Sequence, residues 1–129
     1  MTELVKRKLI EVALPLEAIN IASGREGYIY RGNPSAVHKW WAQRPLAACR
    51  AVLFASVVDD PASDPDRFPT PKAQEDERRR LFSIIEKLVL WESTTDERVL
   101  EEARSEIRRA TGGNPPRILD PFCGGGSIL

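Results

Sequence analysis

The chain has 129 residues, which is enough for one small domain with a single core and too few for two. Its composition, 42% hydrophobic and 29% charged, excludes wholesale disorder and collagen-like sequence. Nineteen basic and nineteen acidic residues cancel, so no overall positive field favours nucleic acid or an anionic membrane. The first 58 residues nevertheless carry eight basic and four acidic side chains, so a polyanion is expected to contact this half.

Two patterns divide the first third of the chain. Apolar residues at helical spacing predict a first helix over residues 4–14, which Pro15 ends or redirects. Residues 24–32 then contain three glycines, two tyrosines and two arginines, a composition typical of a loop. This loop is either a binding loop or a plain connector.

Two further helices are predicted before residue 59. Asn33 and Pro34 form a helix-start signal that leads into a segment with Trp40 and Trp41. The segment 46–58 is apolar on nearly every face, so we expect it to be the buried centre of the domain.

The rest of the helical region has clear boundaries. Four prolines mark residues 59–71 as a surface loop or linker, and Thr70 with Pro71 begins a long amphipathic helix. Its arginines at 78–80 are expected to face solvent beside neighbouring acids. Thr94 and Glu97 form a capping box that predicts another helix, which the glycine pair at 112–113 ends.

The last fourteen residues differ in kind. A short apolar run at 117–120 ends in Asp120 and is followed by the glycine-rich sequence P-F-C-G-G-G-S, which predicts a strand, a glycine loop and the start of a helix. Such a loop lets a ligand approach the backbone closely. A P-loop would need a lysine after Gly126, and a dinucleotide fingerprint would need glycine where Leu129 stands. A cationic cofactor without phosphate, such as S-adenosylmethionine, suits the remaining pattern.

Residues 120–126, D-P-F-C-G-G-G, resemble the D-P-F-x-G-x-G cofactor motif of amino-group DNA methyltransferases. Upstream, three segments resemble the N-terminal domain of unknown function of adenine-specific DNA methylases, some of which carry a zinc ribbon. These segments are R-K-L-I-E at 7–11, L-P-L-E-A-I-N at 14–20 and H-K-W-W-A-Q-R-P-L-A-A-C-R-A-V-L at 38–53.

The resemblance implies a fold and a cofactor site. The fold would be mainly α, with a helical N-terminal module over 1–114 and the first strand and glycine loop of a Rossmann-like methyltransferase sheet over 115–129. Asp120 would contact the ammonium group of S-adenosylmethionine, and Phe122, Gly124 and Gly126 would shape the pocket. The D-P-P-Y-like motif that such enzymes need for catalysis does not occur in the chain. We therefore expect a fragment of a longer enzyme that is inactive alone, with no catalytic residues of its own.

A set of basic and aromatic residues in the first half could contact DNA by stacking on bases or pairing with phosphates. The set comprises Arg25, Arg31, His38, Trp40, Arg44 and Arg50. The alternative for the tryptophans is packing in the core. The competing function is a non-enzymatic helical module that binds DNA or protein.

The remaining expectations concern metals, membranes and assembly. Cys49, Cys123 and His38 are too few and too dispersed for a structural zinc site. No apolar run is long enough to span a bilayer and no secretory signal is present, so we expect a cytoplasmic protein without a membrane partner. An unpaired C-terminal strand could also join two copies into a homodimer.

Overall fold

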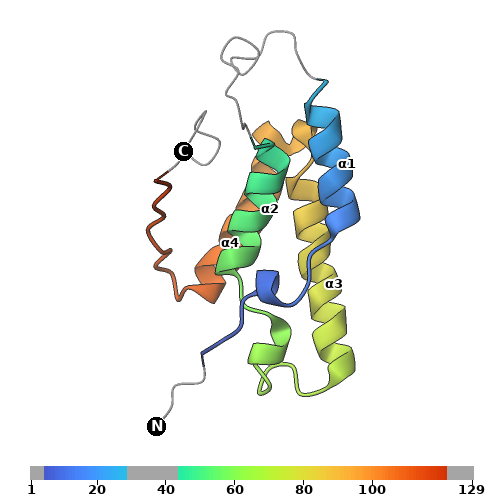
Figure 1. The fold of residues 1–129 in the computed structure, drawn as a ribbon. Coiled ribbons are helices and arrows are strands. Elements are labelled where there is room, and N and C mark those ends of the chain that lie inside the picture. Colours follow the sequence, from blue (N-terminus) through green and yellow to red (C-terminus); the bar gives the residue numbers. More distant parts are fainter. Residues whose placement is uncertain (1–4, 29–43, 122–129) are drawn as a thin grey trace.

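A computed structural model describes residues 5–28 and 44–121, and within these ranges the fold is entirely helical apart from one isolated β-bridge. Four helices run alternately up and down beside one another (Figure 1). They are α1 (Leu16–Glu26), α2 (Leu46–Val57), α3 (Pro71–Leu88) and α4 (Glu97–Ala110). The prediction of a mainly helical module is confirmed.

Helix α2 lies at the centre of the bundle and contacts each of the other three helices. Its core-facing side carries Ala47, Ala51 and Ala55, whose small side chains let neighbouring helices approach closely, together with the fully buried Phe54. Leu81, Ile84, Ile85 and Leu88 of α3 complete most of the core from the other side. The predicted helix over 46–58 is therefore confirmed, as is its central position.

The predicted helix over residues 4–14 is wrong. This segment contains only a 3-10 turn, η1 (Leu9–Glu11), and the first α-helix begins after Pro15. Backbone groups of the segment bond instead to the end of α2, from Leu9 N to Val58 O at 2.9 Å and from Asp60 N to Arg7 O at 2.9 Å. This pairing buries Leu9 completely, so a tertiary contact outweighs the local helical pattern.

The boundary between α1 and the following loop also differs from the prediction. Residues 24–26 belong to the last turn of α1, so the first three residues of the expected loop over 24–32 are helical. The helix predicted to start at Asn33 lies outside the described residues.

The connection between α2 and α3 follows the predicted linker and contains a 3-10 turn, η3 (Pro61–Ser63). Thr70 caps α3 as expected, because its hydroxyl oxygen accepts a hydrogen bond from Ala73 N at 3.1 Å and Pro71 occupies the first helical position. The Thr70 cap and Pro71 at the first helical position were both predicted from neighbouring residues, and both are confirmed.

The start of α4 differs by two residues from the prediction. Thr94 lies in a 3-10 turn, η4 (Trp91–Thr95), and Asp96 caps the helix by accepting from Arg98 N at 3.0 Å. The expected Thr94 and Glu97 capping box is therefore wrong. A carboxylate at the cap also interacts favourably with the helix dipole, which explains why Asp96 takes this position.

The chain leaves α4 through Gly112 and Gly113, whose φ angles of +62° and +85° are left-handed. Gly113 N donates to Arg108 O at 2.8 Å and closes this turn. Residues 114–120 then carry no regular secondary structure, so the strand predicted at 117–120 is not found. A strand requires a paired neighbour, and no described segment pairs with this one.

Candidate functional site

The C-terminal tail, residues 114–121, carries the first two residues of the glycine-rich motif. From the end of α4 it runs back toward the end of the bundle where α2 begins (Figure 1). Residues 112–119 are exposed, and Leu119 has an exposed fraction of 87%. Asp120 is half-buried, so the tail is most enclosed at the predicted cofactor residue.

The first turn of α2 is held by the last residue of α1. The Glu26 carboxylate accepts hydrogen bonds from Leu46 N at 2.9 Å and from Ala47 N at 3.0 Å. A carboxylate at a helix N-terminus satisfies free N–H groups and interacts favourably with the positive end of the helix dipole. Glu26 therefore joins the end of α1 to the start of α2.

Cys49 lies one turn into α2 and is buried, but it does not belong to the core cluster. Burial raises the pKa of its thiol, the carboxylates of Glu26 and Asp120 raise it further, and the Arg44 guanidinium lowers it. The raised pKa keeps Cys49 protonated at neutral pH and makes it a poor nucleophile.

Arg50, one of the predicted DNA contacts, packs within the bundle instead. Its guanidinium donates to Leu88 O at 3.4 Å and to Thr94 Oγ1 at 3.2 Å. It thus binds the end of α3 and the turn η4, where a cation satisfies an unpaired helix carbonyl. The geometry supports a structural role for this residue.

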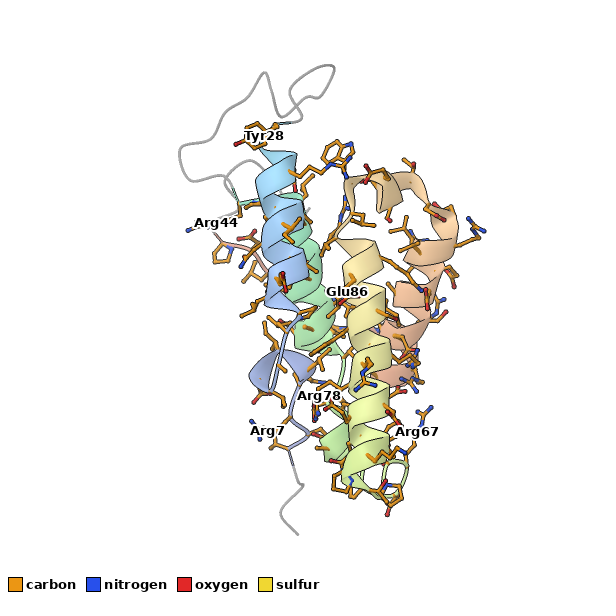
Figure 2. The ribbon with its side chains drawn as sticks, turned by 90° about the vertical axis from the view of Figure 1, so that its right-hand side faces the viewer. Arg7, Tyr28, Arg44, Arg67, Arg78 and Glu86 are labelled. Atoms are coloured by element: carbon orange, nitrogen blue, oxygen red, sulfur yellow. The ribbon has the colours of Figure 1, made fainter. Side chains whose placement is uncertain are left out.

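Two other predicted DNA contacts lie at the end of the bundle where α1 ends and α2 begins. Arg25 pairs with Glu92 on η4, and both side chains are exposed. Arg44 is exposed beside the start of α2, and Figure 2 shows it at the same end as Tyr28. Of the predicted site residues, Asp120 and Arg44 both affect the pKa of Cys49, and Arg25 lies in the last turn of α1.

The other predicted site residues lie outside the described residues. For the DNA contacts these are Arg31, His38 and Trp40, and for the cofactor pocket they are Phe122, Gly124 and Gly126.

The arginine cluster at 78–80 does not face solvent as a unit. Arg78 is 16% exposed and donates from Nε and Nη2 to both carboxylate oxygens of Asp60, each at 2.9 Å. Asp60 is 1% exposed and also accepts from Ala62 N. Hydrogen bonding to Asp60 raises the pKa of Arg78. Only Arg79, at 73% exposure, matches the expected solvated position.

A second ion-pair network joins α3 to α4. Glu77 accepts from Arg80 at 2.7 Å and from Arg109 at 3.2 Å, and Arg80 also donates to Glu106 at 2.8 Å. Hydrogen bonds from Arg80 lower the pKa of Glu77. Sequence reasoning missed the pairs that join α3 to α4 and the Asp60–Arg78 pair, because none of them involves a motif and their partners are 18 to 32 residues apart.

The described residues contain no group of three or more histidine, cysteine or acidic side chains that could hold a metal ion. Within the same ranges, no helix is long and apolar enough to cross a membrane. The fold and site define a helical module whose α1–α2 end faces the beginning of a glycine-rich motif.

Comparison with known families gives a match over the first two-thirds of the chain. Residues 13–84 match the family described as "Protein of unknown function (DUF1156)", and this match covers more than half of the chain. The chain belongs to that family. The matched range begins just before α1 and ends within α3, so it contains the Glu26–α2 contact and the Asp60–Arg78 pair. Neither a curated protein nor a solved structure matches the chain.

Proposed function

We propose that this chain is the N-terminal helical module, with the first strand and glycine loop, of an S-adenosylmethionine-dependent DNA adenine methyltransferase. The observation that carries the proposal is the sequence D-P-F-C-G-G-G at 120–126, directly after a helical module of the DUF1156 family. The course of the tail supports it, because an extended segment with exposed Ile118 and Leu119 is suited to join a sheet.

The residues present fit a cationic cofactor. A carboxylate can accept hydrogen bonds from an ammonium group, and Asp120 is the half-buried carboxylate of the motif. S-adenosylmethionine would supply the methyl group. The adenine N6 atom would form a bond to the methyl carbon while the carbon–sulfur bond breaks, leaving a thioether and releasing a proton from N6. The chain's own part in this reaction would be to position the cofactor.

The test compares the 129-residue chain with the protein encoded by the whole reading frame. Each is incubated with labelled S-adenosylmethionine and duplex DNA, and N6-methyladenine is measured. We expect methyl transfer by the whole protein, none by the chain alone, and loss of transfer in the whole protein with Asp120→Ala. The matched control is Asp66→Ala, which changes an exposed carboxylate of the linker.

A folded whole protein that neither binds S-adenosylmethionine nor methylates DNA would overturn this proposal. Salt-dependent binding to duplex DNA without cofactor affinity would instead favour the alternative of a helical binding module. Arg44→Ala should then weaken this binding. Arg50 is not expected to contact DNA, because its guanidinium is bound to Leu88 and Thr94.

A further inference from the structure

We propose that a groove between α1 and α3 binds a basic amphipathic helix of a separate protein. The groove has a volume of about 360 Å³ and is lined by Pro15, Leu16, Glu17, Ala18, Ile21 and Glu86. We call it the α1–α3 groove. This inference does not depend on the proposed function, because it uses neither the tail nor the glycine-rich motif.

The walls of the groove are apolar and exposed. Leu16 and Ile21 are large aliphatic residues, yet their exposed fractions are 60% and 66%. Single exposed aliphatic side chains are common on protein surfaces, but apolar side chains gathered in one groove are typical of a surface that binds a partner. Walls this exposed suit a helix laid along the groove, whereas small molecules are usually enclosed by their sites.

The two acidic residues of the groove lack partners within the chain. In residues 5–28 and 44–121, nearly all acidic side chains have a hydrogen-bond or charged partner, and the exceptions are Glu17, Asp66 and Glu86. Two of these three exceptions lie in the α1–α3 groove. The groove therefore combines apolar walls with two carboxylates that are available to a partner.

The position of Glu86 is unfavourable for the isolated chain. Glu86 lies in the last turn of α3, where the negative end of the helix dipole disfavours a carboxylate. Its neighbour Lys87 does not compensate the charge, because the Lys87 ammonium group pairs with Glu102 at 3.3 Å. Figure 2 shows Glu86 on α3 beside α1. A cation of a bound partner would compensate this charge.

The charges select the class of partner. Two unpaired carboxylates repel the phosphates of nucleic acids and anionic lipids. A second copy docked through the same face would bring four such carboxylates together. A helix with aliphatic side chains on one face and lysine or arginine beside them complements both the walls and the carboxylates.

The course of the chain leaves the groove accessible. The tail lies on the other side of the bundle from α1 and α3 (Figure 1), so it does not cover the groove. The groove therefore fits a helix supplied by a separate protein.

The first experiment titrates the 129-residue chain with a fluorescent peptide of leucine and lysine that forms an amphipathic helix, and follows binding by fluorescence anisotropy. One control peptide has glutamate in place of lysine, and the other has the same residues in an order without helical periodicity. We expect the lysine peptide to bind about tenfold more tightly than either control, and less tightly as salt is raised. Absence of binding, or equal affinity for all three peptides, would overturn the inference.

Charge reversal tests whether the peptide binds in the groove. Glu17→Lys and Glu86→Lys should each weaken binding of the lysine peptide about fivefold, and the double variant should prefer the glutamate peptide. The matched control, Asp66→Lys, reverses the unpaired carboxylate that lies outside the groove, and should change the affinity less than about twofold. Equal losses in the three single variants would show a response to net charge alone and would overturn the inference.

An apolar variant tests the wall of the groove. Ile21→Ser should weaken binding of the lysine peptide about tenfold, because it removes an aliphatic contact. The matched control, Val52→Ser, changes an exposed aliphatic residue of α2 and should bind the peptide normally. Circular dichroism checks that both variants are folded. Normal binding by Ile21→Ser would place the peptide outside the groove and contradict the proposal.

The last experiment tests the source of the partner. The protein encoded by the whole reading frame should bind the lysine peptide as tightly as the 129-residue chain does. Loss of binding in the whole protein would show that another part of it occupies the groove. A dimer of the 129-residue chain in light scattering that Ile21→Ser dissociates would show self-association through this face. Either of these two results would overturn the assignment to a separate protein.

Discussion

Arg78 and Asp60 form the most enclosed ion pair of the described chain. Both oxygens of the carboxylate face guanidinium nitrogens at 2.9 Å, and Ala62 N supplies a further hydrogen bond at 3.0 Å. The net stability from forming such a pair is small, because two charges must leave water. Removing one partner is costly, because the other charge then remains buried without compensation.

We expect Arg78→Met to lower the free energy of unfolding by about 2–3 kcal/mol, since it leaves Asp60 unpaired. The neighbouring Arg79→Met changes an exposed arginine and should have an effect within about 0.5 kcal/mol. Urea unfolding followed by circular dichroism measures both. Similar losses in the two variants would show that Asp60 is not held as described.

Glu26 links two helices that are separated by a long connection. It accepts from two backbone N–H groups of α2, whereas the N-cap residue Pro45 makes no side-chain cap hydrogen bond. We expect Glu26→Ala to lower the free energy of unfolding by about 1–2 kcal/mol, the usual effect of losing a helix cap. Glu17→Ala in the first turn of α1 should have a smaller effect, of about 0.5 kcal/mol. Thermal unfolding of the two variants would distinguish a cap from a surface charge.

The helices are stabilised by different means at their two ends. Local side chains cap the starts of α3 and α4, through Thr70 and Asp96. The start of α2 depends on a residue of another helix, and the end of α4 depends on two glycines in left-handed conformations.

Two glycines should respond to alanine in opposite ways. Gly24 lies inside α1 with open space around a new Cβ, so Gly24→Ala should stabilise the protein by about 0.5–1 kcal/mol. Gly113 also has open space, but its φ is +85°, so Gly113→Ala should destabilise by about 1–2 kcal/mol. Differential scanning calorimetry gives the sign of each change. Destabilisation by both would place the end of α1 in a conformation other than a helix.

Ion pairs of Glu77 make the stability of the molecule depend on pH. The pKa of Glu77 in the folded chain lies below its ordinary value of 4.5 because Arg80 donates hydrogen bonds to its carboxylate. Glu77 therefore contributes stability at pH values above 4.5. This contribution is lost as the pH falls through the lowered folded-state pKa.

We expect the urea midpoint to decrease between pH 7 and pH values well below 4.5, and to decrease less in Glu77→Gln, which cannot be protonated. The matched control is Glu86→Gln, an exposed position of the same helix, which should retain the pH dependence of the unaltered chain. The same dependence in Glu77→Gln and the unaltered chain would show that Arg80 and Arg109 do not lower the pKa of Glu77 in the folded chain.

The segments that sequence reasoning placed correctly are those governed by neighbouring residues. Thr70 and Pro71 specify the start of α3, the prolines specify the linker, and the continuous apolar sequence of α2 indicates a central helix. Residues 5–15 show where this reasoning failed. Their apolar spacing favours a helix, but their backbone pairs with residues 58–60 and excludes it.

Local sequence specifies the helical class, both ends of α2, the start of α3 and the end of α4, because caps, prolines, glycines and apolar periodicity act over a few residues. The distant partners of Glu26, Arg50 and Asp60 depend instead on how the helices pack. These hydrogen bonds span 18 to 44 residues. No local sequence pattern selects partners this far apart, so the packing of the helices selects them.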